Sequence, residues 1–212
     1  MKFIEFKERF KDLTVIPSKI IFNSTAARYS DYNQIERWCK KGLLIQLRRG
    51  LYILGKNDRR IEPSHVFLAG QIYQPSYVSL EFALNYYGII PEMVSDITSV
   101  TTRKTSRFTG EFGNFIYQKI KPEFFRGFLC QKDDNGLEYF MAESEKALAD
   151  FIYLNIGRFS LINLKDVLLE SYRFENLNFL NQDKIRFYFR LFGIKKMNAI
   201  AEILCEMIKE DL

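Results

Sequence analysis

A polar helix followed directly by two apolar runs around an Arg-Arg-Gly turn is the feature that most constrains the fold of this chain. The runs Leu43–Leu47 and Leu51–Leu54 are rich in residues that favour strands, and Arg48-Arg49-Gly50 joins them. Two such runs around a short turn containing Gly predict a β-hairpin. Gly42 comes directly before the hairpin and is a typical residue to end a helix.

Three helices are predicted before this hairpin. Phenylalanines recur at helical spacing over Phe3–Phe10, which predicts an amphipathic first helix. Pro17 separates it from a short second helix expected over Ser18–Ala27, and a third helix is expected over Ser30–Lys41. Three helices and a hairpin in this order are typical of a winged helix-turn-helix.

The predicted third helix has an apolar stripe made of Ile35, Trp38 and Cys39 and an opposite face of long polar side chains. A recognition helix has this arrangement, because one face packs on its own domain and the other reads base edges in the major groove. A solvated helix face is the alternative, and the two arginines of the hairpin turn favour DNA binding over it. The residues expected to contact DNA are Asn33, Gln34, Arg37, Lys40, Lys41, Arg48 and Arg49.

Positive charge is concentrated in the first part of the chain. Residues 1–60 hold 14 Lys and Arg against 6 Asp and Glu, whereas the remainder holds 17 against 20. A compact basic unit is the electrostatic pattern expected of phosphate binding, although a solubilising surface would give the same balance.

The polar stretch Gly55–Arg60 separates this unit from the rest, so we predict a winged-helix domain over residues 1–57 and a second domain over residues 61–212. Helical patterns in the second domain cover Pro63–Tyr73, Leu80–Tyr87, Glu145–Leu154, Leu164–Tyr172, Asp183–Phe192 and Lys196–Lys209. Strand patterns cover Ile97–Thr102, Asn114–Ile120, Phe128–Gln131 and Leu137–Met141. The fold class is therefore α+β, a mainly antiparallel sheet with helices on both sides and a helical C-terminus.

Four segments, in this order along the chain, resemble the AbiEi family of antitoxins from abortive-infection toxin–antitoxin systems. They are the hairpin region Lys41–Tyr52, the segment Tyr77–Pro91, the stretch Val100–Lys104 and the segment Ala142–Asp150. The resemblance implies a repressor that binds its own promoter through the winged helix. It also implies that the second domain counteracts a nucleotidyltransferase-type toxin encoded beside it, without requiring direct contact with that toxin.

An enzyme is the main alternative in the second domain, where Glu145, Lys146 and Asp150 could hold a metal ion. Their spacing differs from that of metal-dependent nucleases, and Lys146 and Asp150 have the i, i+4 spacing of an ordinary pair on a helix surface. The single histidine, His65, has no partner carboxylate nearby in sequence and is expected to begin a helix. We therefore expect no catalytic site, no metal and no cofactor.

A basic turn in the second domain contains Arg103, Lys104 and Arg107, which are either a second set of phosphate contacts or a solvated turn. Three cysteines far apart in sequence fit a reducing compartment, and with no apolar stretch long enough for a membrane span they predict a cytoplasmic protein. The leading hypothesis is a DNA-binding repressor; the sequence does not fix its oligomeric state, and a homodimer would match paired half-sites on DNA. The alternatives are a nucleic-acid-processing enzyme targeted by its winged helix and a non-enzymatic interaction scaffold.

Overall fold

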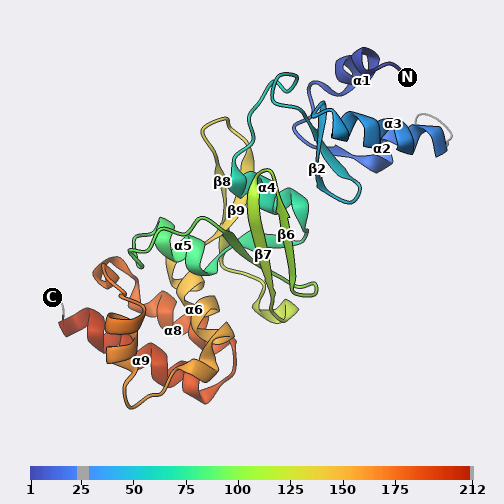
Figure 1. The fold of residues 1–212 in the computed structure, drawn as a ribbon. Coiled ribbons are helices and arrows are strands. Elements are labelled where there is room, and N and C mark those ends of the chain that lie inside the picture. The colour runs from blue at the N-terminus through green and yellow to red at the C-terminus, as the bar shows by residue number, and fades with distance from the viewer. Residues whose placement is uncertain (23–28, 211–212) are drawn as a thin grey trace.

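The computed structural model describes residues 1–22 and 29–210, in which three parts follow one another from the N-terminal unit through a central sheet to a C-terminal group of helices (Figure 1). The N-terminal unit contains α1 (Phe3–Phe10), β1 (Ile16–Pro17), α2 (Ser18–Phe22), α3 (Tyr29–Lys40), β2 (Leu44–Arg48) and β3 (Leu51–Leu54). The first helix, the hairpin and the end of the third helix near Gly42 are confirmed. Of the predicted second helix, the part after Phe22 lies outside the described residues.

A small aromatic and aliphatic core holds the N-terminal unit together. The rings of Phe6 and Trp38 have their centroids 4.9 Å apart and are almost completely buried, so α1 packs on the inner face of α3. The strand β1 was not predicted, because it is only two residues long and contains Pro17. It pairs with β3 and completes a three-stranded antiparallel sheet in the order β1-β3-β2.

The second part is a sheet of six strands in the order β6-β7-β5-β4-β9-β8. Its strands are β4 (Ser76–Val78), β5 (Ile97–Thr101), β6 (Ser106–Gly110), β7 (Gly113–Lys119), β8 (Phe128–Lys132) and β9 (Glu138–Ala142). Around it lie α4 (His65–Ile72), α5 (Leu80–Tyr86) and α6 (Ser144–Leu154). The α+β class is confirmed, and so is the start of α4 at His65.

The expectation of a mainly antiparallel sheet is only partly right. Of the five strand contacts, β5 with β7 and β4 with β9 are parallel. The strands β4 and β6 were not predicted, and β4 sits in the middle of the sheet. Three residues are too few to show an alternating pattern, so the pairing of β4 with both neighbours could not be read from the sequence.

Helices cover both faces of this sheet. Tyr77 of β4 pairs with Val100 of β5, and Tyr117 of β7 pairs with Ser99, the residue before Val100. Because consecutive residues of a strand point to opposite faces, the two tyrosines lie on opposite faces of the sheet. On one face the Tyr117 hydroxyl donates to the Ala69 carbonyl of α4 at 2.7 Å. On the other face Tyr77 reaches α6, which carries the chain toward the C-terminal helices.

The third part is helical, as predicted. It contains α7 (Leu164–Asp166), a π-helical turn over Val167–Ser171, α8 (Gln182–Leu191) and α9 (Lys195–Glu210). Shorter 3-10 turns occur at Pro122–Phe124, Ile156–Arg158 and Leu177–Phe179. Buried residues of α8 and α9, among them Phe189 and Leu204, join the same core as the sheet. Within the described residues, no helix is both long enough and apolar enough to cross a lipid bilayer.

The stretch between the N-terminal unit and the sheet is held by side chains rather than left free. Asp58 pairs with Lys7 of α1 at 2.7 Å, and Arg59 donates to Glu62 at 2.7 and 2.6 Å. Arg60 pairs with Asp12. Arg59 also lies over the Phe112 ring, with its guanidinium carbon 5.3 Å from the centroid, so these polar residues anchor the stretch to both neighbouring parts.

Candidate nucleic-acid interface

The outer face of α3 is the exposed part of the N-terminal unit that carries the predicted recognition residues. Ile35 and Trp38 are buried against the unit's own core, whereas Arg37 and Lys40 are exposed. The guanidinium of Arg37 donates to the Asn33 carbonyl one turn earlier, at 3.3 Å, and Asn33 itself is half-buried. Arg37 is thus free to extend away from the protein.

Glu36 lies next to Arg37 on the exposed side of the helix, and the sequence reasoning did not include it. Its carboxylate is 2.7 Å from the Lys40 ammonium, and the hydrogen bond from Lys40 lowers the pKa of Glu36. A carboxylate at this position disfavours phosphate but can accept a hydrogen bond from the amino group of cytosine. The charge face of α3 is therefore mixed, and among the described residues Arg37 is a cation of this face without an acidic partner.

Gln34 and Lys41 do not lie on the outer face of α3 with Arg37 and Lys40. The Gln34 amide donates to the Met1 carbonyl at 2.6 Å and lines a cavity of about 80 Å³ between α1, α2 and α3. Lys41 is exposed in the turn after α3, just before Gly42 with its φ of 68°. The Gln34 side chain is therefore used in the contact with Met1, while Lys41 extends the exposed basic surface.

The two arginines of the hairpin turn are not equivalent. Arg48 is half-buried, and its Nε donates to the carbonyl of Ile72 at the end of α4. Arg49 is exposed, and its carbonyl accepts a hydrogen bond from Arg48 at 3.0 Å. Arg48 therefore ties the hairpin to the second part of the protein, and Arg49 is the arginine of this turn that faces solvent.

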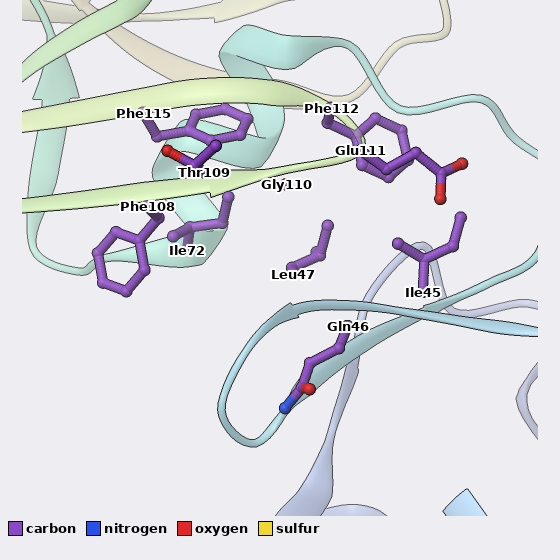
Figure 2. Close-up of a pocket in the computed structure, with 10 residues that line it drawn as sticks. All are labelled: Ile45, Gln46, Leu47, Ile72, Phe108, Thr109, Gly110, Glu111, Phe112 and Phe115. Atoms are coloured by element: carbon purple, nitrogen blue, oxygen red, sulfur yellow. The ribbon is translucent and has the colours of Figure 1, made fainter. Parts of the chain in front are cut away.

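The hairpin also packs against the sheet through apolar side chains (Figure 2). Leu47 of β2 faces Ile72, Phe108 and Phe112 across a gap of about 10 Å³. That volume is about the minimum that one water molecule needs, so the junction is a packed contact and not a ligand pocket. One outer strand of the six-stranded sheet, β6, packs against the hairpin here.

The predicted basic turn of the second domain divides into two locations. Arg103 stacks over the Tyr73 ring with its guanidinium carbon 4.4 Å from the centroid, and it donates to the Gln74 carbonyl at 3.2 Å. Lys104 is exposed, and its carbonyl accepts from the Tyr73 hydroxyl at 3.0 Å. Arg107 instead reaches Asp96, 3.6 Å away, and does not join the other two.

The placement of Arg48 and Arg103 brings the two basic turns together. Their partners, the carbonyls of Ile72 and Gln74, are two residues apart at the end of α4. The segments that build this region contain no Asp or Glu: residues 37–57, 63–80, 97–110 and 113–122. Glu111, between two of these segments, lies beside Ile45 at the junction of the hairpin and the sheet. The exposed cations of the region are Arg49, Arg103 and Lys104.

The expectation that Lys146 and Asp150 form a helix surface pair is wrong. Both side chains are completely buried, and the Lys146 ammonium donates to Asp150 and to the Tyr77 hydroxyl, the latter at 2.9 Å. The Asp150 carboxylate also accepts from Tyr77 at 2.9 Å and from Ser79 at 3.0 Å. Ser79 stands at the N-cap position of α5, but its hydroxyl is used in this network and makes no capping hydrogen bond. The α6 surface that contains the pair faces the sheet and α8, so the helix has no solvent side there.

Burial acts on both charges of this network. Desolvation raises the pKa of Asp150 and lowers the pKa of Lys146, while their mutual attraction opposes both shifts. Glu145 is also buried, but it accepts from the backbone of Asn181 at 2.9 Å and belongs to a separate contact. In residues 1–22 and 29–210, no three His, Cys, Asp or Glu side chains gather in a way that could hold a metal ion.

The single histidine lies apart from this network. His65 is exposed at the start of α4, and its ring stands edge-on to Phe112 with the centroids 6.4 Å apart.

Comparison of the chain with protein-family models and with curated proteins gives no match.

Proposed function

We propose that residues 1–57 form a winged helix-turn-helix that binds duplex DNA, and that the protein is a transcriptional repressor. The order α1-β1-α2-α3-β2-β3, with α3 packed on one face and exposed on the other, supports this assignment. The observation that carries the proposal is Arg37, an exposed guanidinium near the centre of the outer face of α3.

In this proposal α3 enters the major groove and Arg37 reads a guanine edge, because a guanidinium can donate to both acceptors of that base. Lys40 and Lys41 neutralise phosphates beside the groove. Glu36 releases Lys40 when the helix docks and either accepts from a cytosine or stays at the groove margin.

Arg49, Arg103 and Lys104 extend the contact along the DNA backbone. Arg103 is already oriented because its guanidinium stacks on the Tyr73 ring. A guanidinium held in this way can donate two hydrogen bonds to a phosphate. Arg48 orients the hairpin turn and does not itself bind phosphate. Arg107 remains with Asp96.

The resemblance to AbiEi antitoxins extends the proposal to the biological role. We infer that the operator lies in the promoter of the protein's own operon. We further infer that the second domain counteracts a nucleotidyltransferase-type toxin encoded beside it, and that the protein works in the cytoplasm without an enzymatic activity of its own.

The test is affinity for the protein's own upstream DNA and for a scrambled duplex, measured at several salt concentrations. Arg37→Ala is expected to cost about 1–3 kcal/mol on the upstream DNA and much less on the scrambled duplex. Lys195→Ala, an exposed cation at the far end of the protein in α9, is the control and should change neither. Affinity that does not fall as salt rises would refute phosphate binding, since bound phosphates must release counterions.

A further inference from the structure

The six-stranded sheet ends in two outer strands, β6 and β8, and one of them contacts the N-terminal unit. The strand β6 packs against the hairpin of the N-terminal unit near Phe108 and Gly110. The other outer strand, β8, pairs with β9 on one side, and nothing in the described part of the chain pairs with its other side. Proteins usually protect such an edge with lysine, proline, a bulge or a covering element. The strand β8 has an uninterrupted register with β9, no proline, and a single lysine at its end, Lys132.

The backbone groups that face outward from β8 can be identified. The Gly127 carbonyl accepts from the Glu143 amide at 3.0 Å, and the Asp133 amide donates to the Leu137 carbonyl at 3.0 Å. Inward and outward groups alternate along an antiparallel strand, so the odd-numbered residues between these points bond to β9. Phe128, Cys130 and Lys132 therefore present their amides and carbonyls to the open edge.

The side chains around this edge are apolar and exposed. Leu129 is 53% exposed and Phe140, opposite Cys130 on β9, is 47% exposed. Cys130 is itself an exposed free cysteine. Lys132, the charged residue of β8, lies 3.6 Å from Glu138 of β9, which compensates its charge. The edge thus offers unused hydrogen-bonding groups, with an exposed apolar side chain beside them on each face of the sheet, Leu129 on one and Phe140 on the other.

We propose that a second copy of the chain pairs antiparallel with this edge, around a two-fold axis through Cys130, to form a homodimer with one continuous sheet. In this register Cys130 faces Cys130 of the other copy, and residues at equal distances on either side of it face each other, so Phe128 faces Lys132 of the other copy. The exposed Arg126 lies two residues before Phe128 and the exposed Asp134 two residues after Lys132, so antiparallel pairing brings Arg126 of each copy to the end where Asp134 of the other copy lies. The symmetry repeats this opposite-charge contact on both sides of the axis.

Charge complementarity favours this register over the others that use the same outward groups. An axis through Leu129 would place Arg126 opposite Lys132, and an axis through Gln131 would place Asp134 opposite Phe128. An axis through Lys132 would place the two Lys132 side chains directly opposite each other, which is destabilising. An axis through Phe128 would place Arg126 opposite Cys130 and would leave Asp134 without a basic partner. Only the axis through Cys130 pairs Arg126 with Asp134, and a closed two-fold pair uses up both copies of the edge.

The dimer places two N-terminal units in symmetric positions, which suits paired half-sites on DNA, but its formation requires no DNA. A single strand edge buries little surface, so we expect a weak dimer that dissociates on dilution. Its presence is therefore tested on the full chain alone, and its failure would leave the proposed DNA binding untouched.

The first test is sedimentation velocity over a range of protein concentrations. The unaltered protein is expected to shift from monomer to dimer, whereas Cys130→Lys places like charges on the axis and should remain monomeric. Lys195→Ala is the matched control and should dimerise normally. Circular dichroism establishes that Cys130→Lys is folded. A monomer at every concentration up to about 1 mM, or equal dimerisation of Cys130→Lys, would overturn the proposal.

The second test reads the register. Arg126→Glu and Asp134→Arg should each weaken the dimer by between about twofold and thirtyfold, since each removes two cross-strand pairs. The double variant Arg126→Glu/Asp134→Arg should recover dimerisation. Mild oxidation should link the two Cys130 residues, because directly opposite residues with Cα atoms about 5.5 Å apart lie within disulfide range. No recovery in the double variant, or a dimer that oxidation cannot link, would contradict this register.

Discussion

The Tyr77 hydroxyl and the Asp150 carboxylate, one from the middle strand β4 and the other from α6, meet at 2.9 Å in the interior of the protein. Lys146, also fully buried, donates to both groups. This contact fixes α6 on the sheet face opposite α4 and sets the position from which the chain enters the C-terminal helices. A buried ion pair of this kind contributes to stability only as a complete set, because each charge is tolerated through the others.

Removal of one charge from this network should therefore be costly. Lys146→Met leaves the Asp150 carboxylate buried without its cation, and we expect the free energy of unfolding to fall by about 3–5 kcal/mol. Lys146→Met/Asp150→Leu should cost less than the sum of the two single changes, as measured by urea denaturation. Glu36→Ala, which breaks an exposed pair with Lys40, is the control and should cost less than about 1 kcal/mol. Additive losses in the double variant would indicate that the two charges act independently.

Arg48 and Arg49 should separate stability from DNA binding. Arg48→Ala removes the hydrogen bond to the Ile72 carbonyl and loosens the hairpin from the sheet, so we expect unfolding free energy to fall by about 1–3 kcal/mol. Arg49→Ala should leave stability unchanged within about 0.5 kcal/mol and lower the salt dependence of DNA binding by about one phosphate contact. Denaturation and DNA titration of both variants test this. A loss of stability in Arg49→Ala with none in Arg48→Ala would reverse the assigned roles.

Gly127 precedes β8 at a point where a side chain has no room. Its φ is +78°, and an added Cβ would lie 2.5 Å from the Tyr188 ring, whose hydroxyl donates to Glu143 at 2.6 Å. Gly136, with a φ of +77° and open space around it, is the matched control for backbone strain alone. Gly127→Ala should destabilise the protein by about 1–3 kcal/mol more than Gly136→Ala, because only the first overpacks a core contact. Equal losses in thermal or urea unfolding would show that Tyr188 moves aside freely.

Alkaline pH should destabilise the folded protein through its buried tyrosines. Burial raises the pKa of Tyr77 and Tyr117 far above their ordinary value of 10.0, and both side chains are at most 1% exposed. In the unfolded chain they ionise near pH 10, while in the folded protein they keep their protons. Their contribution to stability is thus intact below pH 10 and is lost as pH rises above it.

The expected slope is a loss of about 1.4 kcal/mol per pH unit for each of the two tyrosines above pH 10. Unfolding free energies measured between pH 8 and 12, together with tyrosinate absorbance, test the effect. Tyr117→Phe removes one of the two ionising groups, so the loss of unfolding free energy per pH unit should be smaller by about 1.4 kcal/mol. A stability that stays constant across this range would mean that the buried hydroxyls ionise as easily as exposed ones.

Local sequence determined the N-terminal elements. The spacing of Phe6 and Phe10 fixes an amphipathic helix, Gly42 ends α3 in a left-handed conformation, and the apolar runs on either side of Arg48–Gly50 form the hairpin. These features depend on contacts between residues a few positions apart, so their patterns are visible in the sequence. The C-terminal helices were predicted for the same reason.

Tertiary structure decided the rest. The i, i+4 spacing of Lys146 and Asp150 is the same on a solvated helix face and on a buried one, and only the packing of α6 between the sheet and α8 makes the pair internal. Arg48 and Arg49 are neighbours of the same type, and the position of Ile72 alone distinguishes them. The strand β4 forms because it lies between β5 and β9. The partners of these residues are determined by contacts between segments far apart in the sequence, and residue spacing along the chain does not indicate which segments will meet.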